Sequence, residues 1–211
     1  MKKHTTPPEQ IETIIAELTA NGEHEYIVKK NAVLTLVLRT IYLDAIDTRV
    51  KVRLVGPGAK ATIVGIVLAK GEGMVRLHTL QSHEAPDTTS NLLVKTALGG
   101  KASCVIDGGI RVEKSAQKTD AYQRNENLLL SQSAHAESKP SLEILANDVR
   151  CTHGATVGPV SENELWYLAT RGISGANARS LIVSGFFRKA VDLIEDVKVK
   201  DNLWQSIEGA L

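Results

Sequence analysis

The stretch Ala61-Thr62-Ile63-Val64-Gly65-Ile66-Val67-Leu68-Ala69 is apolar at nearly every position. A strand with one face in water alternates apolar and polar residues, as residues 50–54 do, whereas a short continuous apolar run suits a strand buried on both faces. The run is also far shorter than the eighteen or so residues that a membrane-spanning helix needs. We therefore predict a β-strand here, with further structure packed on each side of it.

Short apolar or β-branched runs continue in both directions from this stretch, with no helical periodicity between them. They cover residues 32–38, 50–55, 61–69, 74–80, 92–98, 102–106, 128–130 and 142–146. Two-residue hairpin turns are nearly absent, and Asp107-Gly108-Gly109 is the one good candidate. The pattern fits either a sandwich or barrel with long loops or a parallel β-solenoid. Aromatic residues make up only 4% of the chain, which favours a solenoid, whose thin core is aliphatic. We expect this solenoid to span residues 31–160.

Helices are predicted on both sides of this β body. In residues 1–30, Thr6-Pro7-Pro8-Glu9 has the pattern of a helix N-terminus, and Asn21-Gly22 follows as a stop signal. An apolar stripe at helical spacing is formed by Ile11, Ile14, Ile15 and Leu18. We therefore expect a short N-terminal helix that packs on the body.

Residues 161–211 read as a helical region. Ser161 and Glu164 form a capping box, Arg171-Gly172 ends that helix, and Ser174 caps the next one. A final short helix carries Leu203, Trp204 and Ile207. Most of the few aromatic residues gather in this region, and Trp and Phe often anchor interfaces, so we expect a docking surface here.

Composition excludes several classes of function. The 25 Lys+Arg and 24 Asp+Glu residues leave a net charge of +1, which argues against nucleic-acid binding. The first ten residues lead into no apolar signal segment, no run suits membrane insertion, and two cysteines cannot form a disulfide framework, so we expect a cytoplasmic protein. Phosphate-binding and nucleophile-elbow motifs are absent from the sequence, so we expect this chain to bind no nucleotide itself.

The segment Val149-Arg150-Cys151-Thr152-His153-Gly154 holds the main candidate for chemistry. If it is a strand, Cys151 and His153 project to the same face. Together they suit iron or zinc, or a Cys–His nucleophilic pair; the plainer alternative is an inert buried cysteine beside a hydrogen-bonded histidine. A closed metal site normally needs four ligands, so further donors would have to come from another strand or another subunit.

The remaining polar candidates are weaker. His78 and His83 flank a polar segment that we interpret as a solvated loop, with the edge of a sheet as the alternative. Cys104 has the neighbours of a core cysteine. The belt around Asp120 resembles the polar corners of solenoid turns, where Asn and Thr bind turn backbone.

Three blocks taken together resemble the SufB/SufD family of iron–sulfur cluster assembly proteins, and the His-Gly-Ala-Thr-x-Gly form is closer to SufD. The first block is His78-Thr79-Leu80, His83, Pro86, Thr88-Thr89-Ser90 and Lys95; the second is Ala116-Gln117-Lys118-Thr119-Asp120-Ala121 with Asn127-Leu128-Leu129-Leu130-Ser131; the third is Pro140-Ser141-Leu142-Glu143-Ile144, Asp148 to Gly158, Leu165-Trp166-Tyr167-Leu168, Arg171-Gly172-Ile173 and Ala178-Arg179.

The resemblance implies a mainly β fold, a right-handed parallel β-helix followed by C-terminal helices. It implies a non-enzymatic scaffold that pairs through its β-helix with a SufB/SufD-type chain or a second copy, and a transient Fe–S cluster at that interface, with His153 and Cys151 as candidate ligands. It also implies a SufC-like ABC ATPase that docks on the helices. The candidate docking residues are Trp166, Tyr167, Arg171, Gly172, Ile173 and Phe186.

Two departures from the family and two other functions stay open. The chain is about half the usual family length, and no second cysteine appears in residues 131–139, so a homodimer would need Cys151 and His153 from both copies. The alternatives are a subunit associated with an ABC transporter and a β-helix enzyme that acts on carbohydrate or acyl groups with His153 as base.

Overall fold

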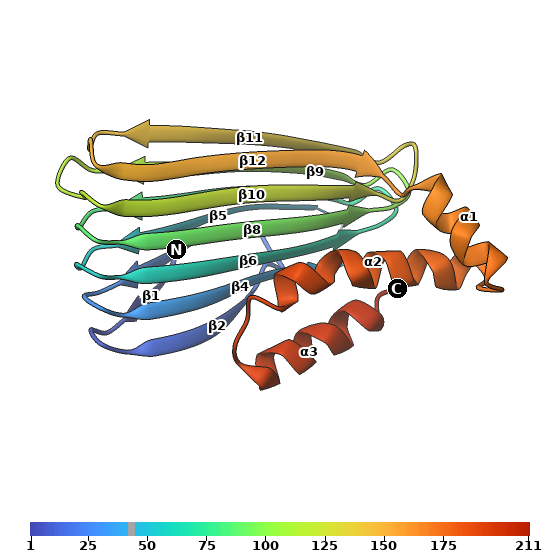
Figure 1. Cartoon of the computed structure of the whole chain (residues 1–211), viewed down its shortest axis with the longest axis horizontal. Coiled ribbons are helices and arrows are strands. Elements are labelled where there is room, and N and C mark those ends of the chain that lie inside the picture. The colour runs from blue at the N-terminus through green and yellow to red at the C-terminus, as the bar shows by residue number, and fades with distance from the viewer. Residues whose placement is uncertain (42–44) are drawn as a thin grey trace.

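A computed structural model describes residues 1–41 and 45–211, and in this part of the chain it contains twelve strands and three helices (Figure 1). The strands are β1 Lys2–Thr6, β2 Ile11–Glu17, β3 Gly22–Val28, β4 Val33–Ile41, β5 Ala45–Leu54, β6 Lys60–Ala69, β7 Met74–His83, β8 Thr89–Leu98, β9 Ser103–Val112, β10 Thr119–Leu129, β11 His135–Ile144 and β12 Val149–Pro159. The helices are α1 Glu162–Thr170, α2 Gly175–Val191 and α3 Val197–Glu208.

Odd-numbered and even-numbered strands form two separate parallel sheets. The odd sheet has the order β1-β3-β5-β7-β9-β11, and the even sheet has the order β12-β10-β8-β6-β4-β2. The chain therefore crosses from one sheet to the other after each strand, and each pair of strands adds one turn to the stack. A chain wound in this way is a parallel β-solenoid. The predicted solenoid is therefore confirmed, and the alternative of a sandwich or barrel is wrong.

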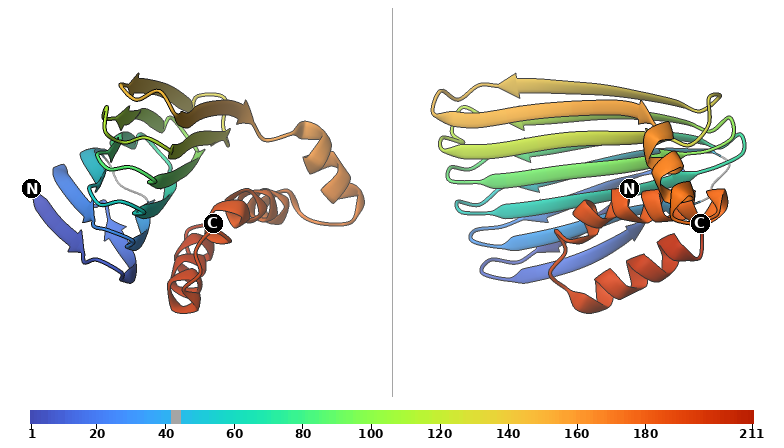
Figure 2. Two further views of the ribbon diagram at one scale, coloured as in Figure 1. Left: turned by 60° about the vertical axis from the view of Figure 1, so that its left-hand side comes forward. Right: turned by 45° about the vertical axis from the view of Figure 1, so that its right-hand side comes forward.

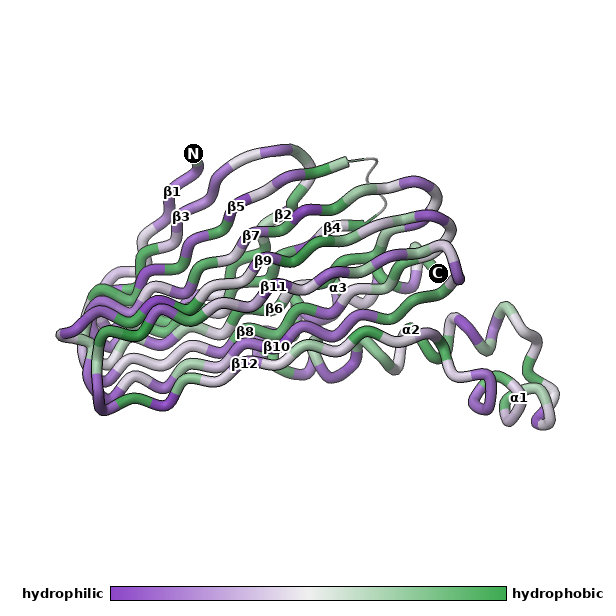
Figure 3. The backbone as a smooth tube through the Cα atoms, turned by 90° about the horizontal axis from the view of Figure 1, so that it is seen from above, coloured by the Kyte–Doolittle hydropathy of each residue, from purple (hydrophilic) through white to green (hydrophobic). Residues whose placement is uncertain are grey.

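The core lies between the two sheets, where the strand register stacks apolar side chains in rows. Leu36 pairs with Ile63, which pairs with Leu92, and all three are buried. Along β5, the buried residues Val50, Val52 and Leu54 alternate with hydrophilic residues (Figure 3), because one face of the odd sheet lies in the core and the other in water.

Strand β6 is buried on both faces. Ile63 and Val67 pack in the core between the sheets. Val64, Ile66 and Leu68 belong to a second cluster on the outer face of the even sheet, and Phe187 of α2 is buried in the same cluster. The predicted strand with structure on each side is therefore confirmed.

Two turns between strands need glycine. A Cβ atom at Gly56 would lie 2.1 Å from the backbone nitrogen of Lys30, one turn away in the stack. Gly100 has φ +66°, and a Cβ atom there would lie 2.8 Å from the carbonyl oxygen of Gly71. Successive turns thus stack backbone against backbone, which leaves no room for a side chain.

The predicted N-terminal helix is wrong. Residues 1–30 form strands β1, β2 and β3, which extend the solenoid. In β2, Ile14 packs against the core while Ile15 packs against the outer cluster under the helices. A strand covered on both faces carries apolar residues at neighbouring positions, and here their spacing coincides with that of a helical stripe.

Two other local interpretations are also wrong. Asp107-Gly108-Gly109 lies in the middle of β9 and makes no hairpin. Glycine is present at 108 because the side chain of Gln123, from the opposite sheet, occupies the space that a Cβ atom would need. The segment from His78 to His83 is the second half of β7 and not a loop.

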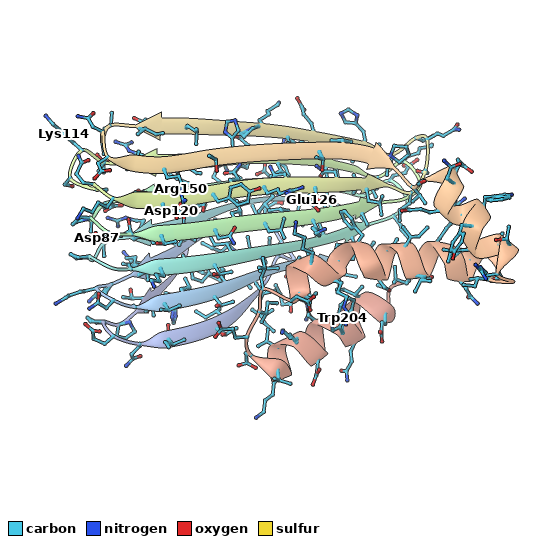
Figure 4. The ribbon with its side chains drawn as sticks, viewed as in Figure 1. Asp87, Lys114, Asp120, Glu126, Arg150 and Trp204 are labelled. Carbon is cyan, nitrogen blue, oxygen red and sulfur yellow. The ribbon has the colours of Figure 1, made fainter. Side chains whose placement is uncertain are left out.

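The C-terminal helical region is confirmed, including its caps. The hydroxyl groups of Ser161 and Ser174 accept hydrogen bonds from the backbone N–H groups of Glu164 and Asn177. Helices α2 and α3 lie along the outer face of the even sheet, and Trp204 of α3 packs at the edge of their shared cluster (Figure 4). Helix α1 projects away from the body (Figure 2). Within residues 1–41 and 45–211, no helix has the length and apolar character to cross a membrane.

Candidate functional site

Strands β11 and β12 form the last turn of the solenoid, which we call the open end. Among the described strands, β12 pairs only with β10 and β11 only with β9. Each of the two strands therefore leaves one edge of backbone N–H and C=O groups without a neighbouring strand. Such an edge is a ready template for another chain.

Cys151 and His153 lie on β12 and project toward the inner side of the open end. Their cross-strand neighbours on β10 are Ala121 and Gln123, which are both buried in the core. The two side chains therefore continue core rows into a turn that nothing covers within the described structure. Cys151 and His153 therefore lie on the same face of β12, as their spacing predicts.

The Cys151 thiol is half-buried and packs beside a small apolar cluster that contains Ile110 and Val112. Burial raises the pKa of this thiol, the negative charge of Asp120 raises it further, and a hydrogen bond from the Ala121 backbone opposes both. A free cysteine with a raised pKa remains a thiol at neutral pH, so it is a poor nucleophile until a metal ion displaces its proton.

The His153 imidazole is exposed, and in the described part of the chain it makes no hydrogen bond or ion pair. It also has no hydrogen bond to the Cys151 thiol. The geometry of a Cys–His nucleophilic pair is thus not formed, because such a pair needs the base within hydrogen-bond reach of the thiol.

The donor set of one chain is small. Within residues 1–41 and 45–211, no group of three or more His, Cys, Asp or Glu residues is placed to hold a metal ion. One thiol and one imidazole are the donor types that iron and zinc accept, but two ligands do not complete a tetrahedral site.

Exposed apolar side chains also lie on the last turn, on β11, β12 and the turn between them. They are Leu142, Ile144, Leu145 and Val157, each between 38% and 49% exposed. On the outer face of the same strand, Arg150 makes a bidentate ion pair with Asp120 of β10 (Figure 4), and Arg150 lowers the pKa of that carboxyl. The open end therefore combines an apolar inner surface with a charged outer rim.

The six predicted docking residues lie in two places. Trp166 and Tyr167 are exposed on α1, and the Arg171 guanidinium lies 5.3 Å from the Tyr167 ring centroid. Gly172 and Ile173 form the turn after α1, where Gly172 has φ +79°. Phe186 lies on α2 and is partly buried in the cluster on the even sheet.

A groove of about 640 Å³ brings part of this set together between α1, α2 and β10. Its lining includes Tyr167, Phe186, Leu128, Leu181 and Ile182. The other four predicted residues do not line the groove. Leu181 is 53% exposed, so the groove offers a large apolar surface to a partner.

An ion pair beneath this groove escaped the sequence interpretation. The Lys95 Nζ atom lies 2.5 Å from the Glu126 Oε2 atom and 4.2 Å from the ring centroid of Phe186. Arg124 contacts the other carboxylate oxygen at 2.6 Å. No local pattern marks this pair, since its two residues lie on different strands.

The two remaining candidate histidines have structural surroundings. His83 is fully buried. Its Nδ1 atom lies 2.8 Å from the Thr88 hydroxyl group, and its Nε2 atom lies 2.8 Å from the Ser90 hydroxyl group. His78 lies on the outer face of the odd sheet, 3.4 Å from the carboxylates of Asp47 and Asp107. Cys104 is buried as predicted, and burial raises the pKa of its thiol to about 12.

Comparison with known proteins places the chain in a family. The family described as SUF system FeS cluster assembly, SufBD core domain, matches residues 11–186. An iron–sulfur cluster assembly SufBD family protein of Mycobacterium leprae is 32% identical over 89% of this chain and 50% of its own length. The chloroplastic protein ABCI7 of Arabidopsis thaliana is 30% identical over 77% of this chain and 34% of its own length.

A third relative is a SufD protein. The iron–sulfur cluster assembly protein SufD of Escherichia coli is 36% identical over 59% of this chain and 30% of its own length. The chain spans about half the length of the SufBD family proteins of mycobacteria that it matches. With a match over most of its β-solenoid and α1 and α2, the chain belongs to the SufBD family of iron–sulfur cluster assembly proteins.

Proposed function

We propose that this chain is a non-enzymatic scaffold subunit on which an iron–sulfur cluster is assembled as cargo. One observation carries the proposal. An exposed imidazole and a half-buried thiol lie on the same side of β12, whose outer edge pairs with no other described strand, and exposed apolar side chains lie on the same turn. Apolar surface favours association, and an incomplete donor set requires it.

The partner at the open end is a SufB/SufD-type chain or a second copy of this chain. A two-fold axis at this edge would bring a second Cys151 and a second His153 to the first pair, which gives the four donors that a closed site takes. Removal of the thiol proton by the bound iron supplies the thiolate that the raised pKa of Cys151 withholds from the free chain.

Anaerobic reconstitution with iron and sulfide tests this role. The chain, alone and with a SufB-type partner, should develop cluster absorption in the visible spectrum, and the Cys151→Ser, His153→Ala variant should lose it. Cys104→Ala is the matched control, because Cys104 is fully buried and lies on β9, in the other sheet from Cys151. An unchanged spectrum in the double variant would contradict the proposal.

The groove between α1, α2 and β10 is the proposed docking site of an ABC-type ATPase. Its apolar lining supports binding of a partner helix or loop, and this chain carries no nucleotide-binding motif of its own. Replacing Leu181 by Asp should weaken ATPase binding at least tenfold by calorimetry. Val197→Asp, at a still more exposed apolar residue on α3, is the control that should bind as the wild type does.

A β-helix enzyme receives no support from the geometry of the edge. A histidine base is normally oriented by a second group, and His153 has no carboxylate hydrogen-bonded to it in the described part of the chain.

A further inference from the structure

The core between the two sheets changes character near the open end. Turns built from β2 to β6 fill it mainly with aliphatic side chains, and the same apolar cluster continues through β9. The next turns place amide and hydroxyl side chains at inward positions, and each is at least nine-tenths buried. They are Thr79 and Gln81 on β7, Thr96 on β8, and Gln123, Asn125 and Asn127 on β10, which we call the amide layer.

The amide layer is continuous. Gln123, Asn125 and Asn127 follow one another on one face of β10, and Asn127 pairs in register with Thr96. Across the core, the Gln123 amide nitrogen donates to the carbonyl oxygen of Gly108, whose cross-strand partner is Thr79. The six side chains therefore form one polar patch that spans both sheets.

Many polar atoms of the amide layer have no hydrogen-bond partner in the part of the chain that the structure describes. They are Thr79 Oγ1, Gln123 Oε1, Asn127 Oδ1 and both amide atoms of Gln81 and of Asn125. A buried polar group without a partner costs a large part of its solvation, and a fold of ordinary marginal stability does not carry so many of them.

We propose that the amide layer binds a short file of water molecules inside the solenoid, and that the file ends beside His153. Water fits the chemistry, because the unpartnered set contains both N–H donors and oxygen acceptors. The layer contains no charged side chain that would select an ion. Buried waters typically bind three such groups each.

The position of the layer links it to the open end. Gln123 is the cross-strand neighbour of His153, and Asn125 is the neighbour of Ala155. The Asn127 amide donates to Ser138 Oγ of β11 at 3.3 Å, so the layer reaches both strands of the last turn. The file would connect the interior of the solenoid to the imidazole by hydrogen bonds. The proposal does not depend on the cluster role of this edge.

Oxygen-17 relaxation dispersion tests the proposal, because it counts waters that stay bound longer than the protein takes to tumble. The wild-type chain should show such waters, and Asn125→Leu should show fewer. Asn91→Leu, the same change on the outward face of β8, is the control that should keep the wild-type number.

Two results would overturn the proposal. One is a wild-type chain without long-lived waters, a measurement that needs no variant to fold. The other is a folded Asn125→Leu chain that keeps the full number of waters. A dry layer would also reveal itself in the denaturation midpoint, since removing two unpartnered atoms would then raise it, whereas removing a water ligand lowers it.

Discussion

At the scale of single residues, His83 shows how a family motif can serve the fold. The imidazole joins the hydroxyl groups of Thr88 and Ser90 in the core, and Thr88 continues the network to Thr119. Burial lowers the pKa of His83 from 6.5 to about 4, and the negative charge of Asp120 opposes this only weakly. The residue is therefore neutral in the folded chain at physiological pH.

The lowered pKa of His83 predicts that the folded chain loses stability in mild acid. Between pH 6.5 and pH 4 the unfolded chain binds a proton at this residue and the folded chain does not, so the free energy of unfolding falls as the pH falls. The full difference amounts to roughly 3 kcal/mol. Urea unfolding at a series of pH values should show a shallower slope in His83→Gln. An unaltered slope in this variant, with exposed His135→Gln as control, would contradict the assignment.

Lys95 and Glu126 form the buried charge pair of the helix–sheet interface, with side chains only 4% and 12% exposed. Burial raises the pKa of Glu126, but the hydrogen bond and charge of Lys95 and the charge of Arg124 outweigh it, so the net pKa is lowered. A carboxylate held in this way stays ionised and depends on its partner.

Removal of one partner should therefore destabilise the chain strongly. Lys95→Met leaves Glu126 charged and partly unpaired, and should cost about 2–4 kcal/mol in urea unfolding. Adding Glu126→Gln should recover part of this loss, so the double-mutant cycle should show coupling. Lys101→Met, which breaks an exposed pair with Glu72, should change stability by about 0.5 kcal/mol or less. Additive effects in the cycle would contradict the coupling.

At the scale of elements, the stacking of turns depends on glycine where backbone meets backbone. Gly56→Ala would place a methyl group 2.1 Å from the Lys30 backbone nitrogen, so the turns must separate. We expect a loss of about 2 kcal/mol or more in thermal unfolding. Gly22→Ala, where nothing lies within 4 Å, should stay within about 1 kcal/mol of the wild type. Equal effects of the two changes would argue against the stacking geometry.

Sequence patterns predicted the elements that have a continuous apolar run or capped ends. Residues 61–69 and the helices after Ser161 and Ser174 fall in this group, because apolar continuity and capping side chains are local signals. Strand β2 was mistaken for a helix because Ile14 and Ile15 face two different apolar layers. No local pattern separates that arrangement from an amphipathic helix.

The sequence pattern does not predict the first part of β10, for a different reason. Its inward residues are Gln123, Asn125 and Asn127, so the alternation that marks a half-buried strand is missing, and only residues 128–130 looked like a strand. The same holds for His83 in β7. The candidate pair Cys151 and His153 was placed correctly on one face, but its position at an unpaired edge follows from strand order, which the sequence does not encode locally.

At the scale of the whole molecule, the solenoid has a gradient along its axis. Aliphatic turns lie at the β2–β6 end, the amide layer follows, and the open end presents two donors among exposed apolar groups. Helices α2 and α3 pack on the outer face of β4, β6 and β8, and α1 follows β12 and projects away from the body (Figures 1 and 2). An edge proposed to hold cargo and a second chain, together with a groove proposed for another partner, is the arrangement expected of a scaffold.

Native mass spectrometry under anaerobic conditions tests the central claim, that cargo is held at the open end between two paired chains. After reconstitution, alone and with a SufB-type partner, the mass of a cluster should appear on a paired species and disappear, together with its iron and sulfide, in Cys151→Ser, His153→Ala. Cluster mass on the single chain, or full retention in this double variant, would contradict the account.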